Sequence, residues 1–411
     1  MAFLKKINKI GLGIFALSFL LLTSCELEPS DKIDPTTSSE LSSQDNGKII
    51  LPDYLLLHEN FGRINGSNSN QRLDPESTPQ IESEDYKNFR EMVRQAMEAV
   101  EPSPCGPTDF NYWINNELEG WDEPALFGFT VYQLASFIGM LDFPTYDALL
   151  FENSSEDQYF GLDGEHTQVL TKTFKDLKRF WDIPSEDIVL AAMHGNMLLD
   201  REKVIRIDKI LYNDDQANAE LYADLIIFLF ENFSQYRNGE HPIFTFNAFA
   251  QTSFEFGGNL IPSKIIMGDG ILDAYTGLGF EDVAPQAILA HEYGHQIQYA
   301  VGTFDNPISS DRAENTRRTE MMADAFSAYY LSHARGATMQ WKRVQQFLEV
   351  FFNIGDCGFS NSGHHGTPLQ RMAAAQWGYD LANSAKKQGE ILSSQEFADL
   401  FDAALPSLVG S

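Results

Sequence analysis

The sequence predicts a mainly helical α+β fold with a small sheet. Between residues 86 and 233, apolar side chains recur several times at the three-and-four spacing of amphipathic helices. Two short β-favouring runs follow at residues 243–250 and 263–267, and a further helical pattern lies at 282–302. With 411 residues, 43% of them hydrophobic and 12% aromatic, the chain is long enough to bury a sizeable core.

The charge of the chain argues against one class of partner. Its 29 basic and 59 acidic side chains give a formal net charge of -30. Such a chain repels a phosphate backbone, so we expect no nucleic-acid partner. The acidity is better explained as a solubilising surface.

The first 24 residues have the pattern of an export signal. Lys5, Lys6 and Lys9 precede an apolar run at residues 10–22, which is too short for a stable transmembrane span. The following Leu-Thr-Ser-Cys ends at Cys25 and resembles a bacterial lipobox. That resemblance implies cleavage before Cys25 and a lipid on its sulfur, and hence an exported protein held at the periplasmic or the cell-surface face of a membrane. The alternative is an ordinary signal peptide with an incidental cysteine.

Residues 25–85 read as an acidic, mostly irregular tether. They are rich in Ser, Asp, Asn, Glu and Pro, and contain too little apolar surface to offset the entropy of ordering. An apolar patch at 49–57 is the exception and could dock on the folded body.

Residues 86–200 are predicted to form a helical lobe. The stretch 126–141 is apolar nearly all round and should be buried, whereas Leu170, Phe174, Leu177 and Trp181 mark one face of a surface helix. The helical pattern continues through 188–193. Such a lobe could be a scaffold or one wall of a substrate cleft, and the sequence favours neither.

Residues 201–405 are predicted to form a second domain. A helix at 217–233 precedes the two β-favouring runs, which could hold an extended peptide at a sheet edge or belong to the core. In the next helix, Asp282 suits the N-cap, Pro285 the first turn, and Gly302 the C-terminal end.

That helix contains His291, Glu292 and His295 in a H-E-x-x-H pattern. Residues four apart lie on the same face of an α-helix, so two imidazoles could bind one Zn²⁺ while Glu292 takes a proton from a metal-activated water. The pattern therefore suggests a metallopeptidase. Two ordinary helix histidines are the alternative, but a buried pair without a metal would need other hydrogen-bond partners.

A catalytic zinc needs a third protein ligand and an open position. Gln298 and Val301 exclude the longer motif that has Gly and His at these positions. Glu320 is the predicted third ligand, and Asp324, one turn later, is predicted to accept the free N–H of His291. In the alternative, Glu320 pairs with Arg317 and Asp324 is solvated. Glu314 is the second choice as ligand.

Three blocks together resemble the bacterial neutral zinc metallopeptidases of the gluzincin-like group. They are HEYGHQIQ at 291–298, RRTEMMADAFSAYYLSHARG at 317–336 and GHHGTPLQRMAAAQWGYDLA at 363–382. The resemblance spans about residues 240 to 385. It implies a zincin-like core with His291, His295 and Glu320 as zinc ligands and Glu292 as general base, acting on a protein or peptide substrate.

The third block also carries a candidate catalytic histidine. A hydrogen-bond donor opposite the metal would stabilise the negative charge that develops on a peptide carbonyl. We predict His365 in this role, with His364 as the second choice, and helix capping or a surface turn as the alternative.

The remaining cysteines and histidines have weaker signals. Cys105 and Cys357 could form a disulfide in an oxidising compartment or stay two free thiols, and Cys357 as a zinc ligand is a weaker option. No partner pattern surrounds the other histidines, which we predict to be structural or solvated: His58, His166, His194, His241 and His333.

The sequence thus predicts zinc-dependent peptide-bond hydrolysis by an exported, lipid-anchored protein. Two alternatives remain open. The chain could be a binding or assembly lipoprotein that keeps the fold without turnover, or a zinc hydrolase of a non-peptide bond.

Overall fold

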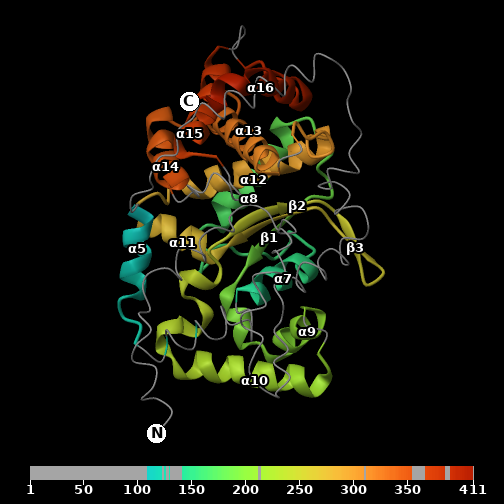
Figure 1. Ribbon diagram of the computed structural model, residues 1–411, viewed down its shortest axis with the longest axis vertical. Coiled ribbons are helices and arrows are strands. Elements are labelled where there is room, and N and C mark those ends of the chain that lie inside the picture. The colour runs from blue at the N-terminus through green and yellow to red at the C-terminus, as the bar shows by residue number, and fades with distance from the viewer. Residues whose placement is uncertain are drawn as a thin grey trace.

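The computed structural model describes residues 109–122, 125, 129, 141–211, 214–309, 312–353, 366–384 and 389–410. In these residues, helices lie on both sides of a small sheet (Figure 1). The prediction of a mainly helical α+β fold with a small sheet is therefore confirmed. The signal peptide, the tether, most of the stretch 126–141 and all three cysteines fall outside the described residues.

The main sheet has three strands in the order β1-β5-β2. Strand β5 (Lys264–Gly268) runs parallel to β1 (Val189–Met193) and antiparallel to β2 (Ala248–Gln251). The helix predicted at residues 188–193 is therefore wrong, because these residues form β1. All five residues of β1 are buried, and a short, wholly apolar run of this kind fits a buried helix and a buried strand equally well.

The predicted strands are only partly as expected. The run at 263–267 matches β5 to within one residue, whereas the run at 243–250 contributes only β2, its first part forming the 3-10 helix η5 (Pro242–Phe244). Between β2 and β5, the chain makes a hairpin of β3 (Phe254–Phe256) and β4 (Asn259–Ile261). Its turn residues Gly257 and Gly258 both have positive φ, at 58° and 80°, as a two-residue hairpin turn requires.

Two hydrophobic cores meet at the main sheet. Because side chains alternate along a strand, Ile265 and Met267 pack into one core while Ile266 packs into the other. Below the sheet in Figure 1 lie α7 (Asp142–Phe151), α9 (Arg201–Leu211) and α10 (Gln216–Asn232). The other core is built by α8 (Thr167–Phe180), α12 (Ala284–Val301), α13 (Arg312–Ser332), α14 (Trp341–Asn353), α15 (Pro368–Asn383) and α16 (Ser394–Val409).

Two more helices, α5 (Asp109–Leu118) and α11 (Asp269–Gly277), lie beside the sheet (Figure 1). Strand β1 comes from the segment predicted as a helical lobe and pairs with β5 of the following segment. The division of the chain at residue 200 remains a prediction.

The outer edge of β1 is covered by polar side chains of the loop that precedes α8. The backbone N–H of Leu190 donates to Ser155 Oγ at 2.8 Å, and that of Ala192 donates to Gln158 Oε1 at 2.9 Å. One hydroxyl oxygen and one amide oxygen thus replace the carbonyl oxygens of a neighbouring strand as hydrogen-bond acceptors.

Small residues let α12, α13 and α15 approach closely. A Cβ atom on Gly294 of α12 would lie 3.0 Å from Ala323 Cα of α13, and one on Gly378 of α15 would lie 2.3 Å from the carbonyl oxygen of Ala325. Helix α12 ends at Val301, and its C-cap is Gly302, whose φ of +75° suits glycine, as predicted. Its N-cap is Val283 rather than Asp282, whose carboxylate instead accepts a bond from Arg343 at 2.6 Å.

Within the described residues, every helix is too short or too polar to cross a lipid bilayer.

Candidate metal centre

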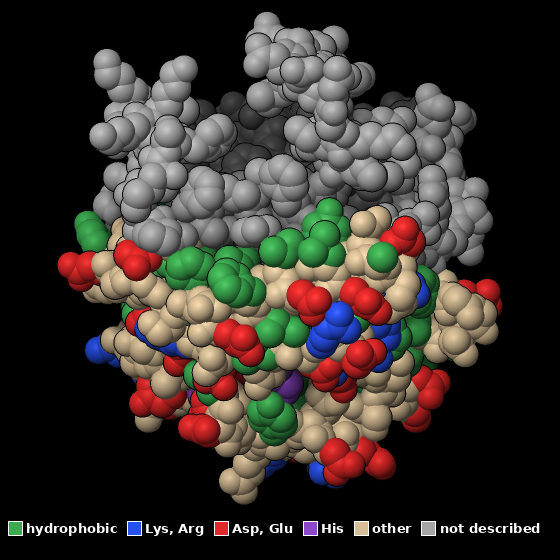
Figure 2. Space-filling model, turned by 90° about the horizontal axis from the view of Figure 1, so that it is seen from below, with side chains coloured by type: hydrophobic (Ala, Val, Ile, Leu, Met, Phe, Trp, Pro, Cys, Tyr) green, Lys and Arg blue, Asp and Glu red, His purple; other side chains and the backbone are tan. Residues whose placement is uncertain are grey.

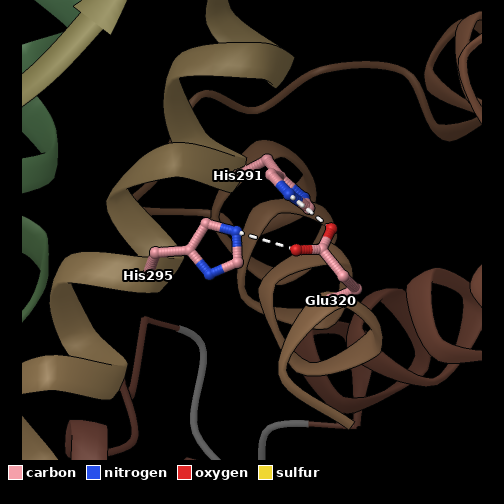
Figure 3. A group of neighbouring side chains, drawn as sticks. All are labelled: His291, His295 and Glu320. Carbon is pink, nitrogen blue, oxygen red and sulfur yellow. Dashed lines mark ion pairs between the residues drawn. The ribbon is translucent and has the colours of Figure 1, made fainter. Parts of the chain in front are cut away.

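Helices α12 and α13 bring His291, His295 and Glu320 together (Figure 3). Glu320 Oε2 lies 3.4 Å from His291 Nε2, and Glu320 Oε1 lies 3.4 Å from His295 Nε2. The two histidines share one face of α12 because they are four residues apart. All three side chains are at most 2% exposed.

The chemistry of this group suits a metal ion. Metal sites in proteins are commonly built from His, Cys, Asp and Glu. Among the described residues, His291, His295 and Glu320 are the group of three such side chains whose ligand atoms all lie within 4.8 Å of one another. A tetrahedral zinc with bonds of about 2.05 Å would hold its ligand atoms about 3.3 Å apart. The two observed separations of 3.4 Å, each to a different oxygen of Glu320, are close to that value, and one ligand atom from each residue lies within 4.8 Å of the others. A cation would also offset the cost of burying the carboxylate of Glu320 between two imidazoles.

The ring of His291 is oriented by Asp324. Its Nδ1 lies 2.9 Å from Asp324 Oδ1, which is the contact predicted from the sequence. This contact leaves Nε2 on the other side of the ring, where it faces Glu320. Asp324 is 2% exposed, so the alternative of a solvated Asp324 is wrong.

The ring of His295 is oriented by Gln298, through a contact that the sequence reasoning missed. Gln298 Nε2 donates to the Thr319 carbonyl of α13 at 2.6 Å, which turns Oε1 toward His295 Nδ1 at 2.9 Å. The amide oxygen can only accept, so the proton lies on Nδ1 and Nε2 again faces the site. The spacing of three residues on one helix could have signalled this contact.

Arg371 of α15 is a second residue of the site that the sequence reasoning missed. Its guanidinium donates two bonds of 2.8 Å to the carboxylate of Asp324, and its Nη2 lies 3.7 Å from Glu320 Oε2. The guanidinium lies over the ring of Phe352, 4.6 Å from its centre. A capping box at Thr367 begins α15 and so fixes Arg371 in the first turn. Arg371 therefore holds two carboxylates of α13 in place.

Gln296 attaches the metal-site helix to the sheet. Its side-chain amide donates to the carbonyl of Gln251, at the end of β2, and to that of Lys264, at the start of β5. All residues of β2 and β5 are buried. This burial agrees with the reading of these strands as core.

The remaining predicted site residues are placed as follows. Glu292 is fully buried on α12, directly after His291. Glu314, the second choice as ligand, is not part of the three-residue group. Cys25, Cys105, Cys357, His364 and His365 lie outside the described residues, and their roles stay predictions.

Three other histidines have structural contacts. His166 is buried and lies 3.2 Å from the hydroxyl of Thr276, and burial lowers its pKa. His241 is 1% exposed, and burial together with the charge of Arg237 lowers its pKa to about 4. His333 lies 2.9 Å from the carbonyl of Glu390. These contacts agree with the structural roles predicted for them.

Comparison of the chain with protein-family models, with curated proteins and with solved structures found no match. The site itself therefore carries the functional argument. Its two histidines and one glutamate fit the H-E-x-x-H plus Glu pattern of a zincin-like centre.

Proposed function

We propose that the protein is a zinc-dependent peptidase with a zincin-like core. The observation that carries this proposal is the buried group of His291, His295 and Glu320, with Glu292 on the same helix as the two histidines. Zinc is the metal of choice because two imidazole nitrogens and one carboxylate oxygen are typical ligands of catalytic zinc. Three protein ligands, rather than four, leave one position for water and substrate.

When bound at these three residues, zinc supplies a Lewis acid that polarises a peptide carbonyl and makes water more acidic. The rest of the chemistry belongs to side chains of the chain. Asp324 and Gln298 orient the two imidazoles so that each presents Nε2 to the site. Arg371 keeps Asp324 oriented through its two hydrogen bonds.

Glu292 is the proposed general base. It accepts a proton from the attacking water and returns it to the nitrogen of the leaving amine, so one carboxyl group serves both halves of the reaction. His365 is the proposed donor to the developing oxyanion, with His364 as the second choice.

The experiment on this function combines metal analysis with an activity assay. The purified protein is expected to contain one zinc per chain and to cleave peptides of a denatured protein library. Glu292→Gln should keep the zinc and lose about a hundredfold or more in turnover. Glu320→Ala should lose the metal as well. A Glu292→Gln protein with wild-type turnover would remove the proposed base.

We also propose an exported protein anchored through a lipid on Cys25, with no nucleic-acid partner. The support is the apolar run that ends at Cys25 and the net charge of -30. Labelling with a clickable fatty acid checks the anchor. Label should appear on the wild type and be absent from Cys25→Ser, and an unlabelled wild type would contradict the proposal.

The burial of the metal group favours a second candidate. Ligands that are at most 2% exposed would also suit a binding or assembly lipoprotein that uses the metal only to hold α12 and α13 together. That protein would contain zinc, lose stability when the zinc is removed, and cleave nothing in the peptide library. A third outcome, cleavage of ester substrates but of no peptide, would indicate a hydrolase of a non-peptide bond.

A further inference from the structure

A second candidate site lies where β1 and β5 end. The two strands are parallel, with Met193 paired to Gly268, so the next residues, His194 and Asp269, emerge side by side. Their side chains meet, with His194 Nδ1 2.7 Å from Asp269 Oδ2. The carboxyl ends of parallel strands are a common place for ligands in proteins that contain such sheets.

The imidazole of this pair is held firmly. The side chain of Asp269 is 5% exposed, and its other oxygen accepts the N–H of Gly161 at 3.2 Å. The ring of Tyr159 stacks on the imidazole at 4.0 Å between centres and 15° between planes. In the tautomer whose Nδ1–H donates to Asp269, Nε2 carries the lone pair and can accept a hydrogen bond. Nε2 has no hydrogen-bond partner among the described residues, although the side chain is only 21% exposed.

His194 and Tyr159 line a cavity of about 360 Å³. The other walls come from α7, the 3-10 helix η3 (Gly195–Leu199) and the start of α9. Two carboxylates in these walls lie beside cations. Asp147 accepts bonds from Lys203 at 2.8 Å and from Arg206 at 2.6 Å, and Glu152 Oε1 lies 3.6 Å from the same Lys203 Nζ.

Two further carboxylates in the lining, those of Asp157 and Asp200, have no cation within ion-pair distance among the described residues. Acidic side chains are spread widely over the surface of this protein, as the face in Figure 2 shows, so they would not mark a site by themselves. The additional feature is the fixed imidazole acceptor of His194 in the same cavity. A ligand that suits this lining brings hydrogen-bond donors and positive charge.

We propose that this cavity binds a small aliphatic amine. Its ammonium group donates to His194 Nε2 and to the carboxylates of Asp157 and Asp200. The volume of about 360 Å³ falls in the range of small-molecule pockets.

This site is separate from the candidate metal centre. The metal-site helix reaches the sheet through Gln296 at Lys264, the first residue of β5, whereas the cavity lies beyond the last residue of β5 and at the outer edge of β1. The two sites share no residue, so the amine proposal stands whether or not the protein is a peptidase.

The test is calorimetric titration of the full chain with 1,4-diaminobutane, and in parallel with the uncharged 1,4-butanediol. The diamine is expected to bind at one site and the diol is not. His194→Asn keeps a donor for Asp269 but removes the Nε2 acceptor, and it should weaken diamine binding by about tenfold or more. Asp200→Asn should weaken it as well.

Asp176→Asn is the matched control, because it removes a half-buried carboxylate on α8 that pairs with Lys172 and does not line the cavity. It should leave the affinity unchanged. In ¹⁵N spectra, the imidazole resonances of His194 should shift as the wild type is titrated with diamine. Absence of diamine binding at millimolar concentration, equal binding of the diol, or an unchanged affinity in folded His194→Asn would overturn the proposal.

Discussion

Replacing Gly294 by alanine tests how closely the metal centre depends on the contact between α12 and α13. A Cβ at this position would lie 3.0 Å from Ala323 Cα, 3.2 Å from Ala323 Cβ and 3.3 Å from Ala323 O. Ordinary contacts between carbon atoms lie at about 3.5–4.0 Å. None of the three atoms belongs to a flexible side chain, so the two helices must separate by a few tenths of an ångström.

That separation acts on the metal ligands directly. His291 and His295 flank Gly294 on α12, while Glu320 lies one turn before Ala323 on α13. Metal sites tolerate deviations of about 0.2 Å in ligand distance, so the zinc affinity should fall by about 10–100-fold. Overpacking should also cost about 1–3 kcal/mol of unfolding free energy in the metal-free protein, partly offset by the helix propensity of alanine.

The assay is a competition titration of metal-free protein against a chromophoric zinc chelator, with denaturant unfolding measured in parallel. Gly120→Ala is the control, since nothing lies within 4 Å of a Cβ there, and its zinc affinity should equal that of the wild type. Adding Ala323→Gly to Gly294→Ala removes one of the three close contacts and should recover part of the affinity. Wild-type zinc affinity in Gly294→Ala would refute the reasoning.

Three further predictions concern buried charges. Arg371→Lys keeps the charge but loses the two-pronged bond to Asp324, so zinc affinity should fall about tenfold, and an unchanged competition titration would contradict this. Burial and the nearby Asp214 raise the pKa of Asp208 to about 7. Between about pH 4 and pH 7, the folded chain therefore keeps a proton on Asp208 that the unfolded chain has released. The contribution of this carboxyl to the free energy of unfolding is full below about pH 4 and falls by about 4 kcal/mol as the pH rises to about 7. Asp208→Asn should abolish this pH dependence of the unfolding free energy, measured by urea unfolding. A pH dependence that survives in the variant would contradict the prediction. Burial lowers the pKa of Lys264 to about 7, although its Nζ donates to two carbonyls at the end of α7. Because the unfolded chain then binds more protons between about pH 7 and 10, unfolding free energy should rise over that range, by at most about 5 kcal/mol, and Lys264→Met should flatten the rise.

The part of the candidate site that the sequence predicted is local in the chain. His291 and His295 are one helical turn apart, as are Glu320 and Asp324, and helix periodicity places each pair on one face. Arg371 could not be predicted in this way. It reaches Asp324 from a third helix, 47 positions later, and no spacing rule relates the two residues.

The errors in the predicted fold also arise where the structure depends on more than local spacing in the chain. Strand β1 was predicted as helix because a buried apolar run has no polar face that would reveal its period. Asp282 has the side chain of an N-cap but is held by Arg343, 61 positions away in the chain. The pairing of His194 with Asp269 likewise depends on strands that are distant in sequence and adjacent only in the sheet.

The covered edge of β1 has a consequence for how molecules of this protein meet one another. An open strand edge offers a row of N–H and C=O groups to which a strand of a second molecule can pair, which is a common start of aggregation. Here Ser155 and Gln158 already occupy the N–H groups of Leu190 and Ala192. Replacing both side chains by alanine would leave the three strands paired but free these two N–H groups. The edge of β1 could then pair with a strand of a second molecule, so the double variant should aggregate more readily than the wild type.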